Sequence, residues 1–303
     1  MLTIIIRNGI PCVIKVGGRK TTFLNEGLTR AIEEYVSTRG LSDDPVRHGK
    51  VGASVGSQEL LPSEHSAALA QDSTTEAGNS EAGAFAARGC VLIHRRFASR
   101  MENKTHDIKL GRGPAETYKT KKGNQALEEF AAKLLPLTQL VEAIYSVFLP
   151  DEFAKYKKVF DFLNGPLADN IDIAFGVWTS RSLVFDALSN IHRDLEDVCR
   201  GWCALVPCGN FEGGNACFPS LGAKLELPVG KCFIPQVMTL LVDAGSNTRI
   251  GAVVFMRSYA LEHYIGAFTG TRYSVVHFTH QSVHDFYAQE TGELLWAPSE
   301  MPA

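Results

Sequence analysis

Three residues of the sequence have the types and the order of a ligand set for a ferrous ion. His192 and Asp194 are separated by one residue, and His263 lies well downstream. Two imidazoles and a carboxylate can occupy one face of an octahedral Fe(II) ion, which leaves the opposite face open for a chelating cosubstrate and O₂. Arg272 follows His263, and its guanidinium could pair with a carboxylate of such a cosubstrate.

The spacing also predicts how these side chains point. On a β-strand, residues i and i+2 face the same side, so His192 and Asp194 could both point into a barrel while Arg193 points outward. The same alternation places Arg272 and Ser274 on one face. We therefore expect Arg272 and Ser274 to hold the two oxygens of one carboxylate.

Four segments around these residues carry a family resemblance, and they are residues 201–206, 209–219, 261–263 and 270–280. They resemble the core of Fe(II)/2-oxoglutarate-dependent dioxygenases. More narrowly, they are similar to the fungal proteins grouped with the TET/JBP oxygenases, which oxidise methyl groups of pyrimidine bases in DNA. The resemblance covers roughly residues 170–285.

The resemblance implies a role for each residue of the set. His192, Asp194 and His263 would bind Fe(II), and Arg272 would pair with the distal carboxylate of 2-oxoglutarate. Cosubstrate, iron and O₂ together would hydroxylate a C–H bond and release succinate and CO₂. The implied substrate is 5-methylcytosine or thymine in DNA, which must be flipped out of the duplex to reach the iron. A DNA substrate would make the protein nuclear.

Two other functions stay open. A protein or small-molecule 2-oxoglutarate-dependent hydroxylase would share every iron and cosubstrate residue, and the pI of about 6.3 suits it at least as well. An inactive jelly-roll protein that only binds its partner is the second alternative, because an unusual segment precedes His263.

That unusual segment comprises residues 230–250. Relatives in the resembling group run from a turn directly into a strand like residues 251–255, so these residues look additional. The tripeptide at 230–232, Gly-Lys-Cys, can be encoded by a typical splice-donor sequence, which suggests a retained intron. The alternative is a surface loop, which folds tolerate well at a turn. Disruption of the following strand would misassemble the iron site.

Composition predicts a soluble intracellular protein and leaves the oligomeric state open. A chain of 303 residues with 45% hydrophobic content can bury one sizeable core. No run approaches the roughly 18 apolar residues of a membrane span, and the N-terminus lacks the pattern of a signal peptide. Seven cysteines without a compact framework fit a reducing compartment.

Charge is unevenly distributed along a chain whose net charge is −3. Residues 51–87 contain five acidic and no basic side chains among Gly, Ser and Ala, which is typical of a disordered linker. Residues 94–158 contain thirteen Lys and Arg against eight Asp and Glu. Such an excess is expected of a surface that binds DNA. The alternative is an ordinary solvated helix surface.

The chain divides into three parts. Residues 1–41 contain a strand at 2–6 and an amphipathic helix at about 25–38, and they form either a small N-terminal add-on or part of an outer layer. Residues 42–86 form the disordered linker. Residues 87–303 form the dioxygenase domain, which begins with a helical layer.

Within that domain, helices come first and many short strands follow. We expect helices at residues 124–148, where Pro136 should kink or divide the helix, and at 151–163. Strands are expected at residues 91–94, 171–178, 202–206, 216–218, 223–227, 251–256 and 272–279. This order predicts an α+β protein with a double-stranded β-helix, the jelly-roll shape, and flanking helices.

Other groups of ligand-type residues fit structural roles better. Four cysteines cluster between residues 199 and 217, but their gaps lack the paired spacing of a zinc site. His277 should point away from Arg272, and His280 and His284 lie at and beyond the end of the same strand. We expect structural or substrate-contacting roles for these histidines.

Overall fold

The computed structural model describes most of the catalytic region predicted above. The described residues are 2–7, 9–17, 22–39, 89–95, 97–100, 108–111, 121–165, 170–185, 189, 191–227 and 252–296. The predicted linker at 42–86 and the segment at 230–250 lie outside them, so both interpretations stay predictions.

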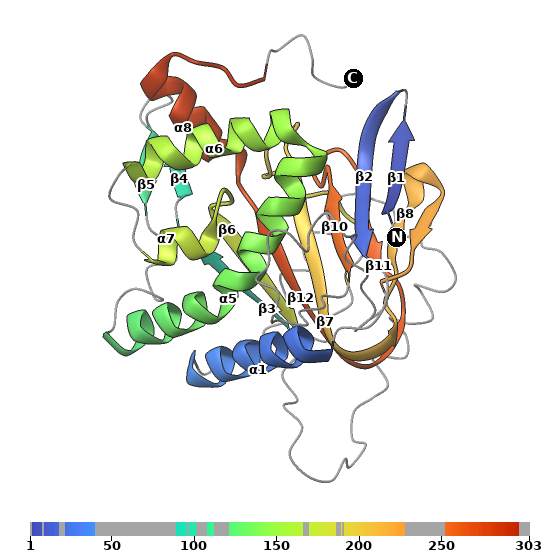
Figure 1. Cartoon of the computed structure of the whole chain (residues 1–303). Helices are drawn as coiled ribbons and strands as arrows, with labels where there is room; N and C mark the ends of the chain where they lie inside the picture. Colours follow the sequence, from blue (N-terminus) through green and yellow to red (C-terminus); the bar gives the residue numbers. More distant parts are fainter. Residues whose placement is uncertain are drawn as a thin grey trace.

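The central element is a sheet of seven antiparallel strands in the order β1-β2-β10-β7-β12-β6-β3 (Figure 1). The strands are β1 (Leu2–Arg7), β2 (Ile10–Gly17), β3 (Gly89–His94), β6 (Ser180–Phe185), β7 (Cys203–Gly213), β10 (Ala252–Met256) and β12 (Phe268–Phe278). β10, which directly follows the unusual segment, pairs with both β2 and β7. The N-terminal hairpin therefore extends the central sheet.

Smaller sheets and a layer of helices complete the fold. One small sheet has the order β11-β8-β9, from β8 (Ala216–Phe218), β9 (Ala223–Leu225) and β11 (Tyr264–Ile265). β4 (Phe97–Arg100) pairs with β5 (Ile108–Gly111). The helices are α1 (Thr22–Arg39), α5 (Lys121–Phe148), α6 (Pro150–Asn164), α7 (Asn170–Phe175) and α8 (Gln281–Thr291). Within the described part of the chain, no helix is long and apolar enough to span a membrane.

Each face of the central sheet has its own core, because side chains alternate along the strands. Val206 and Val275 face the helical layer with Leu134 of α5. Leu205 faces the opposite side, where it packs with Phe218 of the small sheet. Figure 1 shows α1 and α5 on one side of the sheet. The parity of β12 thus directs Arg272 and Ser274 away from the helices.

The observed elements confirm the mixed helix and antiparallel-sheet class, while the double-stranded β-helix itself and the domain boundaries stay predictions. The helices expected at 124–148 and 151–163 correspond to α5 and α6, and α5 continues through Pro136 without dividing. The strand expected at 171–178 is wrong, because Asn170–Phe175 forms helix α7. Short apolar runs do not distinguish a buried strand from a buried helix.

Two histidines are buried within the helical side of the fold. His284 of α8 lies edge-on to Tyr156, with ring centroids 5.2 Å apart, and burial lowers the pKa of His284 to about 3. His277 contacts Trp178, and burial followed by the nearby charge of Arg181 lowers its pKa well below the ordinary value. Neither imidazole has a hydrogen-bond partner among the described residues. Both therefore fold as neutral rings.

Because His277 and His284 are buried as neutral rings, we expect the protein to lose stability in mild acid. The unfolded chain binds a proton at each imidazole near the ordinary pKa of 6.5, whereas folded His284 does so only near 3. The free energy of unfolding is therefore not reduced by His284 above pH 6.5, and it decreases as the pH falls from 6.5 toward 3. At about pH 5, His284 alone should cost about 2 kcal/mol.

Urea unfolding of the wild type and His284→Phe at about pH 7 and about pH 5 measures this effect. Phenylalanine keeps an aromatic ring in the α8 core but cannot bind a proton. We expect the variant to lose clearly less stability between the two pH values than the wild type. Equal losses in the two proteins would contradict the assignment.

Candidate metal centre

The loop between β6 and β7 carries two of the three predicted ligands. His192 and Asp194 do not lie on a regular strand, so the expectation of a strand at this position is wrong. Instead, His192 forms an isolated antiparallel bridge with His263. The His192 amide donates to the His263 carbonyl at 3.1 Å, and the His263 amide donates back at 2.9 Å. Backbone pairing thus brings two distant segments together.

Residues 194 and 198 of this loop are fixed by backbone hydrogen bonds to two neighbouring segments. The Asp194 amide donates to the Ser258 carbonyl, which follows β10, at 3.1 Å. The Val198 amide donates to the Thr279 carbonyl at the end of β12, also at 3.1 Å. Because the backbone is held at residues 194 and 198, the position of Asp194 is defined by the segments that follow β10 and β12.

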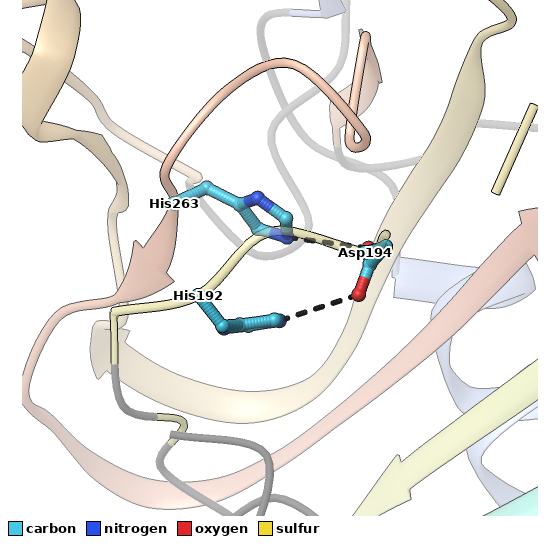
Figure 2. A group of neighbouring side chains, drawn as sticks. All are labelled: His192, Asp194 and His263. Carbon is cyan, nitrogen blue, oxygen red and sulfur yellow. Dashed lines mark ion pairs between the residues drawn. The ribbon is translucent and has the colours of Figure 1, made fainter. Parts of the chain in front are cut away.

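The three side chains converge on one point. Asp194 Oδ1 lies 3.6 Å from His192 Nε2, and Asp194 Oδ2 lies 3.5 Å from His263 Nε2 (Figure 2). One ligand atom from each residue lies within 4.8 Å of the others, and the described residues contain only this group of His, Cys, Asp and Glu with such geometry. The cysteine cluster between 199 and 217 does not form a second one.

The donor set fits a divalent transition metal. Octahedral ligands at about 2.1 Å from one ion lie about 3 Å apart, so small side-chain rotations would close the observed spacing. His263 Nδ1 lies 2.9 Å from the Leu261 carbonyl oxygen. A proton on Nδ1 satisfies that carbonyl and leaves the Nε2 lone pair directed at the shared point. Two imidazoles and one carboxylate match the ligands expected for Fe(II).

The three ligands differ in their exposure to solvent. The side chains of His263 and His192 are 10% and 15% exposed, whereas that of Asp194 is 37% exposed. The two rings are also packed together, with centroids 4.4 Å apart. Among the three ligands, Asp194 is therefore the most accessible to solvent.

Arg272 and Ser274 lie on the same face of β12, as strand alternation predicts. Arg272 is 2% exposed, and its Nη1 donates to Ser274 Oγ at 2.8 Å. The guanidinium lies over the rings of Phe211 and Phe268, at 5.2 Å and 5.8 Å from their centroids. A buried cation with an adjacent hydroxyl is suited to bind a carboxylate.

Two glycines of the 209–219 segment make room for Arg272. Gly214 has φ +61, and a Cβ there would lie 2.8 Å from Arg272 Nε. Gly209 pairs with Arg272 in the sheet and has φ +112, and its Cβ would lie 2.3 Å from the Thr271 carbonyl oxygen. Both positions need glycine, because φ is positive and because neighbouring atoms already occupy the space that a Cβ would take.

A second group of polar side chains adjoins the centre, and sequence analysis missed two of its members. Ser258 Oγ donates to Asp197 Oδ2 at 2.6 Å, and Asp197 Oδ1 lies 3.9 Å from His280 Nδ1. The ring of His94 lies 5.1 Å from that of His280. Burial, followed by the nearby charge of Asp194, raises the pKa of Asp197 well above its ordinary value. The close sequence spacing of Asp197 to Asp194 was the available signal.

Four described lysines of the basic stretch lie away from this centre. They lie on α5 and α6, in the layer that covers the opposite face of the sheet from Arg272, and all four pair with carboxylates. The pairs are Lys133–Glu34, Lys155–Glu152, Lys157–Asp161 and Lys158–Glu293. These lysines fit the alternative interpretation, an ordinary solvated helix surface.

Comparison with solved structures identifies the type of fold. The structure of NgTET1 in complex with 5mC DNA aligns with a TM-score of 0.50 and 12% sequence identity, over 93% of this chain and 77% of that chain. No protein-family model matches the chain, and no curated protein matches it significantly. At this identity the likeness concerns the fold alone. The protein has a TET-like fold that carries a candidate His-Asp-His metal centre.

Proposed function

We propose that the protein is an Fe(II)- and 2-oxoglutarate-dependent dioxygenase that oxidises the methyl group of 5-methylcytosine or thymine in DNA. The observation that carries this proposal is the convergence of His192, Asp194 and His263 within a TET-like fold. The buried pair Arg272–Ser274 supplies the second requirement, a site for a dicarboxylate cosubstrate.

Each side chain has a defined task in this proposal. His192, Asp194 and His263 hold the iron on one face and leave the other face for cosubstrate and O₂. Arg272 and Ser274 bind the distal carboxylate of 2-oxoglutarate. When bound, iron, 2-oxoglutarate and O₂ supply the conversion of a C–H bond to C–OH, with release of succinate and CO₂.

The aromatic rings around Arg272 strengthen its interaction with the cosubstrate. Phe211 and Phe268 cover the guanidinium, which is almost fully removed from solvent. A charge pair is stronger where water is excluded, provided that both partners are satisfied. A buried guanidinium beside a hydroxyl favours binding of an acidic cosubstrate over a neutral one.

Two observations support DNA as the substrate. The similar structure of NgTET1 was solved in complex with 5mC DNA. In addition, His94 and His280 form a cluster of three rings with Phe278, which lies 5.2 Å from His280 and 5.9 Å from His94. Phe278 is buried, but the two imidazoles are partly exposed and offer stacking surfaces and hydrogen-bonding groups for an extruded base. The four paired lysines of the basic stretch do not support a DNA substrate. A DNA substrate would place the protein in the nucleus.

Mass spectrometry of nucleosides tests the proposal. Duplex DNA that contains 5-methylcytosine is incubated with Fe(II), 2-oxoglutarate and either the wild type or His263→Ala. We expect hydroxymethylated bases with the wild type and none with the variant. Succinate without any oxidised base would favour the protein or small-molecule hydroxylase instead. Absence of both products would favour an inactive binding protein.

A further inference from the structure

One exposed apolar residue directly follows a ligand of the candidate metal centre. Leu195 follows Asp194 and is 58% exposed. The other large apolar side chains that are exposed in the described part of the chain lie on the β1–β2 hairpin or on the helical side of the fold, and they are Leu2, Ile4, Ile6, Ile10, Val147, Phe162, Ile173 and Leu294. Leu195 therefore needs an explanation that refers to the site.

Leu195 is the chain neighbour of the most exposed of the three ligands. The Asp194 side chain is 37% exposed, whereas the imidazoles of His192 and His263 are largely covered. We expect a large substrate that delivers one group to the metal to approach past the most exposed ligand. The residue next to Asp194 along the chain is then among the first to contact that substrate.

The turn that carries Leu195 is held rigidly. The Leu195 amide donates to the Arg193 carbonyl at 3.1 Å, and the Asp197 amide donates to the Asp194 carbonyl at 3.0 Å. On the other side, the Gln281 amide donates to the carbonyl of residue 196 at 2.8 Å. A side chain on such a fixed support loses little conformational entropy when it inserts into a partner.

The charges next to Leu195 indicate which of its features is specific. Arg193 is exposed and could contact a phosphate. Glu196 is also exposed, with a side-chain exposure of 88%, and its charge opposes that of Arg193. This turn is therefore not a general phosphate clamp. Its distinctive element is the apolar side chain between these two charged residues.

We propose that Leu195 is a wedge that enters the base stack of duplex DNA and fills the space left by the extruded target base. This inference rests on the proposed function. Flipping a base costs a few kcal/mol of stacking and pairing, and apolar side chains such as leucine offset part of that cost when they insert between bases. Leu195 would thus decide how well the enzyme acts on paired DNA.

The test compares two duplexes that differ only at the target pair. In one duplex 5-methylcytosine is paired with guanine, and in the other it lies opposite an abasic site and is already unpaired. Oxidation rates are measured for the wild type, Leu195→Ala, Leu195→Met and Leu294→Ala. The ratio of the two rates within one protein is independent of how much folded or iron-loaded enzyme is present.

We expect Leu195→Ala to lower the rate on the paired duplex about tenfold relative to the unpaired duplex, which corresponds to about 1.4 kcal/mol. Leu195→Met, which keeps a large apolar side chain, should retain the wild-type ratio, as should the remote Leu294→Ala. In a parallel measurement without O₂, 2-aminopurine in place of the target base should become more fluorescent with the wild type than with Leu195→Ala.

Two results would overturn the inference in distinguishable ways. If Leu195→Ala oxidises both duplexes with an unchanged ratio of the two rates, Leu195 is not a wedge, and the proposed function is unaffected. Succinate formation by the wild type without oxidation of either duplex would contradict the DNA substrate, and the wedge with it.

Discussion

Replacement of Asp194 by asparagine is expected to weaken Fe(II) binding by at least about 100-fold. The two carboxylate oxygens of Asp194 face His192 Nε2 and His263 Nε2, at 3.6 Å and 3.5 Å, so this residue joins both imidazoles into one site. An amide keeps the shape of the side chain but removes the only negative charge of the ligand set. Anaerobic titration with Fe(II), followed by equilibrium dialysis, measures the change.

Asp161→Asn is the matched control for that experiment. Asp161 lies on α6, is 59% exposed and pairs with Lys157, so its loss of charge should leave Fe(II) affinity unchanged. Equal Fe(II) affinity in Asp194→Asn and the wild type would contradict the assignment of Asp194 as a ligand of Fe(II). A fall in affinity that is the same for both variants would point to a general charge effect instead.

Replacement of Arg272 by lysine is expected to raise the Kd for 2-oxoglutarate by up to about 100-fold, because the carboxylate loses a charge-assisted hydrogen bond of about 1.5 to 3 kcal/mol when the two-pronged guanidinium is replaced. Lysine keeps the positive charge but lacks the planar fork, and it would leave the space between Phe211 and Phe268 partly unfilled. Isothermal titration calorimetry of the Fe(II)-loaded protein with 2-oxoglutarate under anaerobic conditions measures this Kd.

Two further variants separate the role of Arg272 from a general disturbance. Ser274→Ala removes one hydrogen-bond partner and should raise the same Kd by about tenfold or less. Arg30→Lys changes an exposed arginine of α1 and should leave the Kd unaltered. Fe(II) affinity should be unchanged in all three variants. An unaltered Kd in Arg272→Lys would mean that the cosubstrate binds elsewhere.

The ligands could be predicted from the sequence, but the way they meet could not. The types and order of His192, Asp194 and His263 were sufficient to suggest a ferrous site. The strand that was expected to orient the first two is absent, and the orientation comes from the backbone bridge between His192 and His263. Such a bridge depends on a partner far along the chain, which local periodicity does not register.

Strands with polar core residues escaped the sequence pattern. β6 carries Arg181, which is fully buried and donates to the carbonyls of Ser180 and Phe175, and burial lowers its pKa to about 9. On its other face, Ser180 and Ser182 are buried as well. Three of the six residues of β6 are polar, and such a pattern does not predict a strand in the core. In contrast, β8 and β10 consist of apolar residues and were predicted at nearly their observed bounds.

Local charge was the least informative part of the sequence. The excess of basic residues between 94 and 158 suggested a DNA-binding face, but Lys155 and Lys158 pair with Glu152 and Glu293 at 3.3 Å and 2.6 Å. Glu293 lies far along the chain, so a count within one window omits it. The net charge of a surface depends on tertiary neighbours, and for this protein the fold carries the DNA proposal instead.

Succinate formation from 2-oxoglutarate tests the central claim most directly. The wild type and His192→Ala are each incubated with Fe(II), 2-oxoglutarate and O₂, and succinate is quantified over time. The candidate centre predicts iron-dependent turnover by the wild type and a rate at least about 100-fold lower in the variant. Equal succinate formation by the two proteins would contradict the assignment of His192, Asp194 and His263 as the iron site.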